Sequence, residues 1–257
     1  MPIPVRSGFP CRRALAALAL LLAACSAGPM AVIGLEPNSL QLGMVAHWPC
    51  DAEGGVALVD SSGNGHDGTL SGVSWVGGHF DGALHFDADG SVTVPSFPQA
   101  AVSWSVALWY RAPAGDYGDN YLTLIGNEHA FLGGWEMSVL LNSTDSEYRF
   151  AYPIGGDAGN AFEHFEAQGV EVDTWLHLAA VVDGKTMRLS FYENGALVGG
   201  SALSHLIQPG NDALSLSRWS SSHHYLVGDL DDIVIFNRAL VQAEVQELRA
   251  QPAPDAG

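Results

Sequence analysis

The chain has 257 residues, of which 47% are hydrophobic, 9% aromatic and 15% charged. This apolar content excludes a disordered tail or a collagen-like fibre and fits one large or two small globular domains. Ten basic residues stand against 28 acidic ones, so the formal net charge is −18. A field of this sign repels phosphate backbones, so we expect no nucleic-acid partner and favour multivalent cations as ligands.

The N-terminal segment carries the features of an export signal. Residues 1–13 contain three arginines and no acid, and residues 14–24 form an uninterrupted apolar run that ends at Cys25. This order matches the n-region and h-region of a secretory signal peptide. A helix of this length spans about 16 Å, roughly half of a hydrocarbon core, and is too short for a permanent transmembrane helix. We therefore expect residues 1–24 to be a signal peptide.

The sequence Leu-Ala-Ala-Cys that ends at Cys25 resembles the lipobox of bacterial lipoproteins. The resemblance implies cleavage before Cys25 and attachment of lipid to it, which tethers the exported chain to a bacterial membrane. Ser26 is similar to the residue that directs lipoproteins to an outer membrane, on its periplasmic or surface side. The alternative is an ordinary signal peptide cut near Ala24 or Ala27, with an incidental cysteine.

The remainder of the chain divides into a spacer, one domain and a tail. Residues 25–41 are mostly small, contain prolines and lack periodicity, so we expect a lipidated N-terminus followed by a spacer. Residues 42–250 form the predicted domain, and residues 251–257 form a flexible tail. One thiol, Cys50, remains once the other cysteines are lost to the signal peptide and to lipid, so we expect no disulfide framework.

Short apolar or alternating runs separated by Gly, Asn, Asp and Ser dominate the domain. In chain order, the predicted strands are residues 45–48, 83–86, 91–94, 104–110, 122–125, 135–141, 148–152, 176–182, 187–193, 196–198, 214–217 and 230–236. About a dozen short strands with almost no helical period favour an all-β sandwich or barrel.

Three local patterns within the domain are clearer than the rest. Residues 104–110 alternate strictly, which predicts a strand with two distinct faces. Asn194 and Gly195 predict a tight hairpin turn, because both residue types accept a positive φ. Helical spacing appears in residues 240–249 and predicts one short C-terminal helix. The apolar stripe of that helix consists of Leu240, Val241, Val245 and Leu248.

Six segments of the domain carry a family pattern. They are Ala-His-Trp at 46–48, Asp-Ser-Ser-Gly-Asn-Gly at 60–65, Gly-Ala-Leu-His-Phe at 82–86, Trp-Ser-Val-Ala-Leu-Trp at 104–109, Trp-Leu-His at 175–177 with the hairpin that follows, and Gly-Asp-Leu-Asp-Asp-Ile-Val-Ile-Phe at 228–236. In this order they resemble the LamG-like jelly-roll domains of the concanavalin A-like lectin and glucanase superfamily. The resemblance covers about residues 44–250. It implies an all-β fold, a two-sheet antiparallel jelly-roll sandwich, with the short helix at its C-terminal end.

Calcium is the expected metal ligand. Hard cations bind several oxygens from loops, and residues 60–68 offer carboxylate, hydroxyl, amide and carbonyl oxygens. The family resemblance implies a structural calcium held by this loop and by an Asp of the closing strand. The candidate ligands are then Asp60, Asn64 and Asp231, with Asp51 in support.

The position of Asp231 within its strand adds to this expectation. An unbroken alternation places Asp231 on the same face as Ile233 and Ile235, where a buried carboxylate needs a partner such as a metal. The alternative is that Asp60 and Asn64 only form Asx turns and that Asp231 accepts backbone hydrogen bonds.

Carbohydrate is an expected ligand, and two polar loops with aromatic residues are its candidate sites. Sugar rings stack on exposed aromatic faces, while Asp, Asn and His side chains bind their hydroxyl groups. The loops lie at residues 116–121 and 219–225. Their candidate ligand-binding residues are Tyr117, Tyr121, Trp219, His223 and Tyr225. The alternative is that these aromatics are half-buried loop residues without a ligand.

No residue pattern typical of catalysis is found. The glucanases of the superfamily carry Glu-x-Asp-x-Glu on one strand, and this motif does not occur in the sequence. Glu163 and Glu166 point to opposite faces if their segment is a strand, so paired acids for glycoside hydrolysis are not evident. His177 lies between apolar neighbours and is expected to be a hydrogen-bonded core residue, and Cys50 a small buried one. We therefore expect no catalytic residue and no enzyme.

The sequence thus predicts a membrane-anchored extracytoplasmic binding module for carbohydrate or protein, with a structural calcium. Two alternatives stay open. The first is an envelope lipoprotein with a structural or adhesive role and no small-molecule ligand. The second is a glycoside hydrolase of the superfamily whose catalytic acids lie at other positions. An exposed aromatic cluster would favour glycan binding, and a flat apolar patch would favour a protein partner. Two carboxylates that face each other in a groove would favour an enzyme.

Overall fold

The computed structural model describes residues 39–114, 121–127, 133–141, 146–153, 160–166, 172–210, 213–217 and 225–254. They lie within one compact unit that extends over residues 35–257. In this described part of the chain, no helix is long and apolar enough to cross a membrane. The predicted signal peptide, Cys25 and most of the predicted spacer lie outside the described residues.

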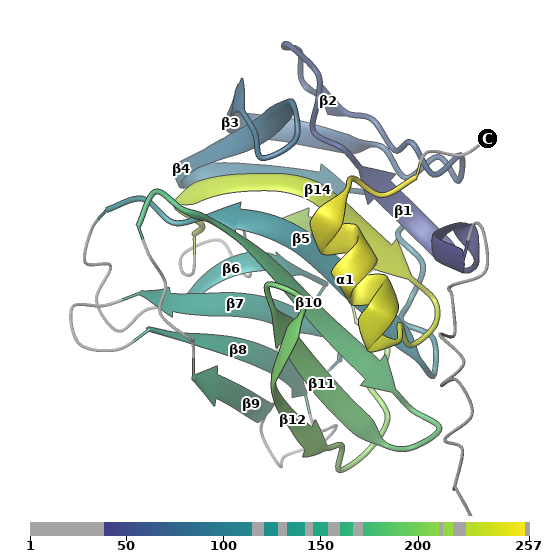
Figure 1. Ribbon diagram of the computed structural model, residues 1–257. Helices are drawn as coiled ribbons and strands as arrows, with labels where there is room; N and C mark the ends of the chain where they lie inside the picture. The colour runs from purple at the N-terminus through teal and green to yellow at the C-terminus, as the bar shows by residue number, and fades with distance from the viewer. Residues whose placement is uncertain are drawn as a thin grey trace, which may run out of the picture. The chain divides into compact units, whose positions relative to one another are not determined.

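Strands make up nearly all of the regular structure (Figure 1). The elements are η1 (Ser39–Gln41), β1 (Met44–Trp48), β2 (Ala57–Leu58), β3 (Gly68–Gly77), β4 (Gly82–Val94), β5 (Trp104–Arg111), β6 (Tyr121–Gly126), β7 (Glu136–Leu141), β8 (Ser146–Pro153), β9 (Asn160–Glu166), β10 (Trp175–Asp183), β11 (Arg188–Glu193), β12 (Ala196–Ala202), β13 (Leu214–Leu216), β14 (Gly228–Phe236) and α1 (Gln242–Ala250). The sequence predicted most of these strands but not β2, β3 or β9.

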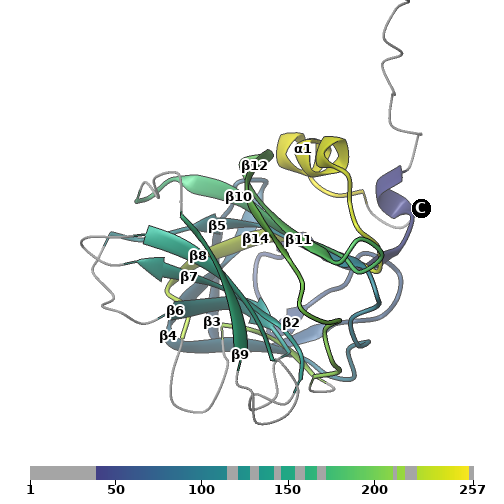
Figure 2. The same cartoon turned by 90° about the horizontal axis from the view of Figure 1, so that it is seen from below.

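All strand pairs that the structure describes are antiparallel. The order is β12-β11-β10-β5-β14-β4-β13-β6-β7-β8-β9, while β1 pairs with β14 and β3 with β4. The sheet curls until β9 and β12, at the two ends of this order, lie near each other (Figures 1 and 2). The predicted all-β antiparallel jelly roll is confirmed, and the short strand β13 makes its two layers one continuous curled sheet.

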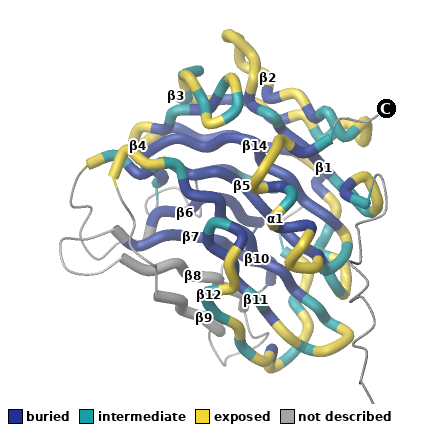
Figure 3. Tube along the Cα trace, viewed as in Figure 1, coloured by how far each residue is buried: buried dark blue, intermediate teal, exposed yellow. Residues whose placement is uncertain are grey.

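The main core lies between the two layers of the curled sheet. On β5, Trp104, Val106, Leu108 and Tyr110 point into this core, as the alternation predicted. Their partners across the gap come from β6, β7 and β13, such as Leu124 and Met137. Figure 3 shows that β5 and β14 are buried along nearly their whole length, because the outer face of these strands is also covered.

Helix α1 covers part of this outer face (Figures 1 and 3). Val245 and Leu248 pack in a second apolar cluster with Phe236 of β14, and burying each such side chain contributes about 1.5–3 kcal/mol. The prediction of a short C-terminal helix is confirmed. The predicted position of Val241 in the buried stripe is wrong. Val241 precedes the first helical turn and is 56% exposed.

A salt bridge fixes the start of α1. Glu244 accepts the backbone N–H of Val241 at 2.9 Å, which satisfies a donor that the first helical turn leaves free. The same carboxylate forms two hydrogen bonds of 2.8 Å with the guanidinium of Arg238. Arg238 also donates to the carbonyls of Ser39 and Leu42. The segment before β1 and the helix are therefore tied to one side chain.

Two local irregularities shape the edges of the sheet. Asn194 and Gly195 have φ values of 49° and 76°, so the tight turn predicted between β11 and β12 is confirmed. In β14 the pairing with β5 shifts between Asp231 and Val234, and Asp232 has a φ of 43°. This β-bulge inserts an extra residue and therefore reverses which side chains of β14 face the core.

The bulge corrects the predicted position of Asp231. Ile233 and Ile235 lie in the core between the layers, but Asp231 pairs with Trp109 on the outer face of the sheet. Asp231 is nevertheless fully buried, because the hairpin between β3 and β4 covers it. The buried carboxylate was thus expected on the wrong face, since strict alternation assumes a strand without a bulge.

Candidate functional site

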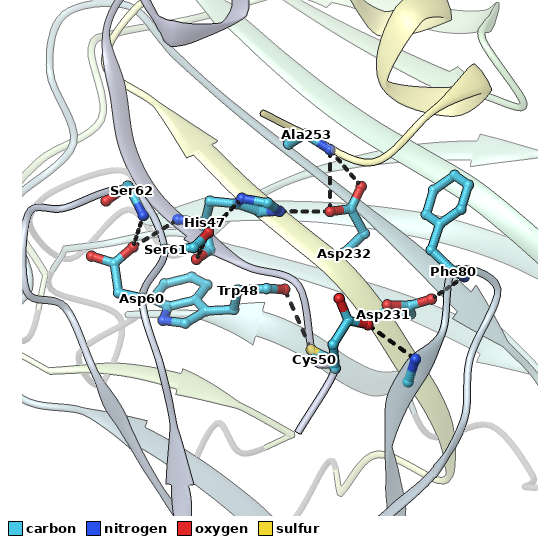
Figure 4. A network of polar contacts seen from close by, with 12 residues as sticks. His47, Trp48, Cys50, Asp60, Ser61, Ser62, Phe80, Asp231, Asp232 and Ala253 are labelled. Carbon is cyan, nitrogen blue, oxygen red and sulfur yellow. Dashed lines mark hydrogen bonds and ion pairs between the residues drawn. The ribbon is translucent and has the colours of Figure 1, made fainter. Parts of the chain in front are cut away.

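The loop that follows β1 is organised by Asp60. Its carboxylate accepts the backbone N–H groups of His47 at 3.0 Å, Ser62 at 2.9 Å and His66 at 2.9 Å. Burial raises the pKa of Asp60, but these hydrogen bonds outweigh burial and lower the pKa below its ordinary value. Asp60 therefore acts as the hydrogen-bond acceptor that shapes the loop (Figure 4).

Asn64 and Asp51 have similar backbone partners. The Asn64 amide nitrogen donates to the carbonyls of Met44 at 3.2 Å and Val45 at 3.0 Å, which pins the loop to β1. Asp51 is exposed, and its Oδ1 accepts the N–H of Gly82 at 3.0 Å. In the described part of the chain, no three His, Cys, Asp or Glu side chains are grouped to hold a metal ion. The predicted donor set also includes the Asn64 amide and carbonyl oxygens, which such a group does not count, so calcium stays a prediction from sequence.

A Ser-His-Asp chain of hydrogen bonds lies beside this loop (Figure 4). Ser61 Oγ is 2.7 Å from His47 Nδ1, and His47 Nε2 is 2.7 Å from Asp232 Oδ1. Nucleophilic catalysis also needs free N–H donors near the serine to stabilise an oxyanion. The N–H of Ser61 is donated to the His47 carbonyl and the N–H of Ser62 to Asp60. We interpret the chain as a structural link between β1, the loop and β14.

The bulge positions Asp232 for this link. Its carboxylate accepts the N–H of Ala253 at 3.2 Å and 3.3 Å, so the segment after α1 is attached to the same network. Cys50 lies beside it, buried as predicted, and its thiol is 3.4 Å from the carbonyl of Trp48. Burial, followed by the charges of Asp231 and Asp232, raises the pKa of the Cys50 thiol. The thiol is therefore an unreactive packing group.

Three adjacent polar residues are buried on the outer face of the sheet. Asp231, Trp109 and His177 are register partners on β14, β5 and β10, and all are at most 4% exposed. Asp231 Oδ2 accepts the N–H groups of His79 at 2.8 Å and Phe80 at 2.9 Å. Asp231 Oδ1, Trp109 Nε1 and His177 Nδ1 are buried without a hydrogen-bond partner within the structure described. These atoms define a polar site that is shielded from bulk solvent.

Burial favours the neutral form of both titratable members of this site. It raises the pKa of Asp231 to about 7 and lowers the pKa of His177 to about 3. The ring of His79 stacks on Trp109, with centroids 3.5 Å apart, and closes the site from outside. His177 is buried as predicted, but its Nδ1 lacks the hydrogen bond that the prediction included.

A cavity of about 210 Å³ opens at another edge of the molecule. Its walls come from the start of β5, the end of β14, β1, and the segments before β5 and β7. The lining includes four aromatic residues, Phe97, Trp104, Trp135 and Phe236, each at most 5% exposed, and the carboxamide residues Gln99 and Asn237. The two indole rings lie 4.4 Å apart at 36°. We call this cavity the aromatic pocket.

The aromatic pocket is not one of the predicted ligand sites. Tyr117, Trp219 and His223 lie outside the described residues, and for Tyr121 only the backbone is described. Tyr225 is half-buried and does not line the aromatic pocket. The pocket was missed because its lining residues are separated by up to about 190 positions in sequence. The available sequence signal was the pair of tryptophans at the starts of two predicted strands, Trp104 and Trp135.

Comparison with known structures gives the same fold. Domain 4 of the GH43 extracellular arabinanase AbnA from Geobacillus stearothermophilus, in complex with arabinotriose, has a TM-score of 0.63 and 20% identity, over 80% of this chain and 98% of that one. The binding domain of Paraclostridial Mosquitocidal Protein 1 has a TM-score of 0.65 and 18% identity, over 82% of this chain. The binding domain of botulinum neurotoxin serotype G has a TM-score of 0.62 and 17% identity.

The chain spans about half of each of these two toxin binding domains, 52% and 50% of their lengths. These identities show a shared fold and nothing about a shared ligand. No curated protein matches the sequence. Residues 86–246 match the family described as the concanavalin A-like lectin/glucanases superfamily. Since this match covers well over half of the chain, the protein belongs to the concanavalin A-like lectin/glucanase superfamily.

Proposed function

We propose that the protein is a carbohydrate-binding module whose ligand occupies the aromatic pocket. The observation that carries the proposal is the lining of this pocket, where aromatic residues at the margin of the core border two carboxamide residues. Aromatic faces pack against the C–H groups of a sugar ring, and a carboxamide donates to and accepts from its hydroxyls. Asn237 is exposed for this contact, whereas Gln99 Oε1 already accepts the Gly210 N–H at 2.7 Å. At about 210 Å³, the pocket is below the roughly 300–1,000 Å³ of drug-sized sites, which suits a single sugar ring.

The comparisons support a binding role over a catalytic one. The arabinanase domain with the same fold is in complex with arabinotriose, and the toxin domains are binding domains. Another structure with this fold, the binding domain of botulinum neurotoxin DC, is in complex with rat synaptotagmin II. Protein is therefore the second candidate ligand class. The aromatic pocket favours carbohydrate, because it is a concave site of sugar size instead of a flat apolar patch.

The proposal is tested by a glycan array followed by calorimetry on the hits, with and without calcium. Asn237 is exposed and lines the pocket, so Asn237→Ala removes one sugar contact without opening the core. We expect it to weaken binding by about threefold to tenfold, the effect of one hydrogen bond. Gln251→Ala, an exposed carboxamide outside the pocket, is the matched control and should bind like wild type.

Two outcomes would contradict this proposal. An array without any bound glycan, from protein with a normal thermal melt, would exclude carbohydrate as the ligand. Shortening of bound oligosaccharides during the incubation would identify a glycoside hydrolase instead.

We also propose that the module is exported and held at a bacterial membrane by lipid on Cys25. The supporting observations are the basic and apolar segments of residues 1–24 and the Leu-Ala-Ala-Cys sequence. A tether of this kind leaves the pocket free to bind glycans outside the cytoplasm. The proposal thus includes export and attachment to a membrane. Fatty-acid labelling and membrane fractionation of the full chain test both.

A further inference from the structure

A second cavity adjoins the aromatic pocket. Its volume is about 490 Å³, and it shares Ala101 and Asn237 with the aromatic pocket. We call it the adjoining cleft. The other residues that line it include Ser103, Asp183 and Lys185. Ala101 and Asn237 line both cavities, which places the two side by side at these residues.

The polar walls of the adjoining cleft are held in place by internal hydrogen bonds. Asp183 accepts the Thr186 hydroxyl at 2.7 Å and the Lys185 N–H at 3.0 Å. Ser103 contacts the same turn from the other side. Its hydroxyl oxygen accepts the Gly184 N–H at 3.1 Å, and its O–H donates to Asp183 Oδ1 at 3.5 Å. Arg238, which also lines the cleft, is paired with Glu244. The cleft is therefore preorganised.

Lys185 is a cation of this cleft that no acid of the described residues neutralises. It is the single lysine of the chain and is exposed. Among the residues that the structure describes, its ammonium group takes part in no ion pair. Three N–H donors on a flexible stem are thus available to a ligand in the cleft.

Charge decides which kind of saccharide fits. Among the described residues, none that lines the aromatic pocket has an ionisable side chain. The chain as a whole carries a formal charge of −18, which repels glycans with repeated carboxylate or sulfate groups. Lys185, beside Asp183, is one positive charge and does not reverse this field. Its N–H donors are therefore expected to bind sugar hydroxyl groups.

We infer that the ligand is a neutral oligosaccharide of at least two units, with one unit in the aromatic pocket and the next in the adjoining cleft beside Lys185. Asn237 lies where the two cavities meet and contacts both units. This inference rests on the proposed carbohydrate binding and adds the length and charge of the ligand. It assigns Lys185 to the second unit only.

Calorimetry on the full chain tests the inference with neutral ladders of one to three units, made from arabinose, xylose, glucose, mannose and galactose, and with a galacturonic acid trimer. For a series that binds, we expect the two-unit saccharide to bind about tenfold more tightly than the single sugar, which corresponds to about 1.4 kcal/mol. Lys185→Ala should weaken the two-unit ligand by about threefold to tenfold and leave the single unit unchanged. Arg188→Ala, which removes an exposed cation outside the cleft, is the control for charge.

Each contrary result has a distinct meaning. Equal affinity for one, two and three units would overturn the second subsite and leave carbohydrate binding intact. Tighter binding of the galacturonic acid trimer than of every neutral ladder would overturn the neutral ligand. If no ladder and no trimer binds, carbohydrate binding itself fails, and this inference fails with it.

Discussion

His177 is a residue whose surroundings hold it neutral. Burial, and to a smaller extent the charges of Arg249 and His79, lowers its pKa from 6.5 to about 3. The pKa in the folded state is therefore below that in the unfolded chain. The stabilisation is complete above pH 6.5 and is lost as the pH falls toward 3, because the unfolded chain then binds the proton more tightly.

This shift predicts a pH-dependent stability difference. Between pH 7 and pH 4.5, wild type should lose about 2–3 kcal/mol more unfolding free energy than His177→Gln, which cannot titrate. Urea unfolding at the two pH values measures the difference. His205→Gln, at a half-buried loop position, should follow wild type. Parallel pH profiles for wild type and His177→Gln would show that His177 is not held neutral.

The loop of residues 60–68 is the element on which the calcium prediction depends. Asp60 accepts three backbone N–H groups there, so Asp60 variants should lose stability whether or not a metal binds. The unmodified protein therefore gives the cleaner test. If calcium is structural, EDTA should lower the melting temperature by about 5–10 °C, and excess calcium should restore it. An unchanged melt in EDTA would exclude a structural calcium.

Lipidation is a property of the whole exported molecule. The expected outcome is that the full chain, expressed in a bacterium, incorporates a fatty-acid probe and fractionates with membranes. Cys25→Ser should abolish both, because acylation requires the Cys25 thiol. Cys11→Ser, whose cysteine lies within the predicted signal peptide, should still be labelled. A Cys25→Ser chain that keeps the label would exclude Cys25 as the lipid site.

Local sequence patterns determined much of the fold. The alternation of residues 104–110 predicted both faces of β5, and Asn194-Gly195 predicted the turn between β11 and β12, because side-chain periodicity and φ preference act over a few residues. Strand β3 was missed because its sequence, GTLSGVSWVG, is mostly polar or small and much of it is exposed. Its pairing with β4 is a long-range contact that local patterns do not encode.

Tertiary structure decided the sites. Sequence alternation placed Asp231 in the core between the layers, but the bulge at Asp232 sends it to the outer face, and a bulge depends on how β14 pairs with β5. The aromatic pocket unites Phe97, Trp104, Trp135 and Asn237, which meet only when the curled sheet closes. The sequence by itself determined the fold class, since that follows from local periodicity. The candidate ligand site required the folded chain, since it is made by residues far apart in sequence.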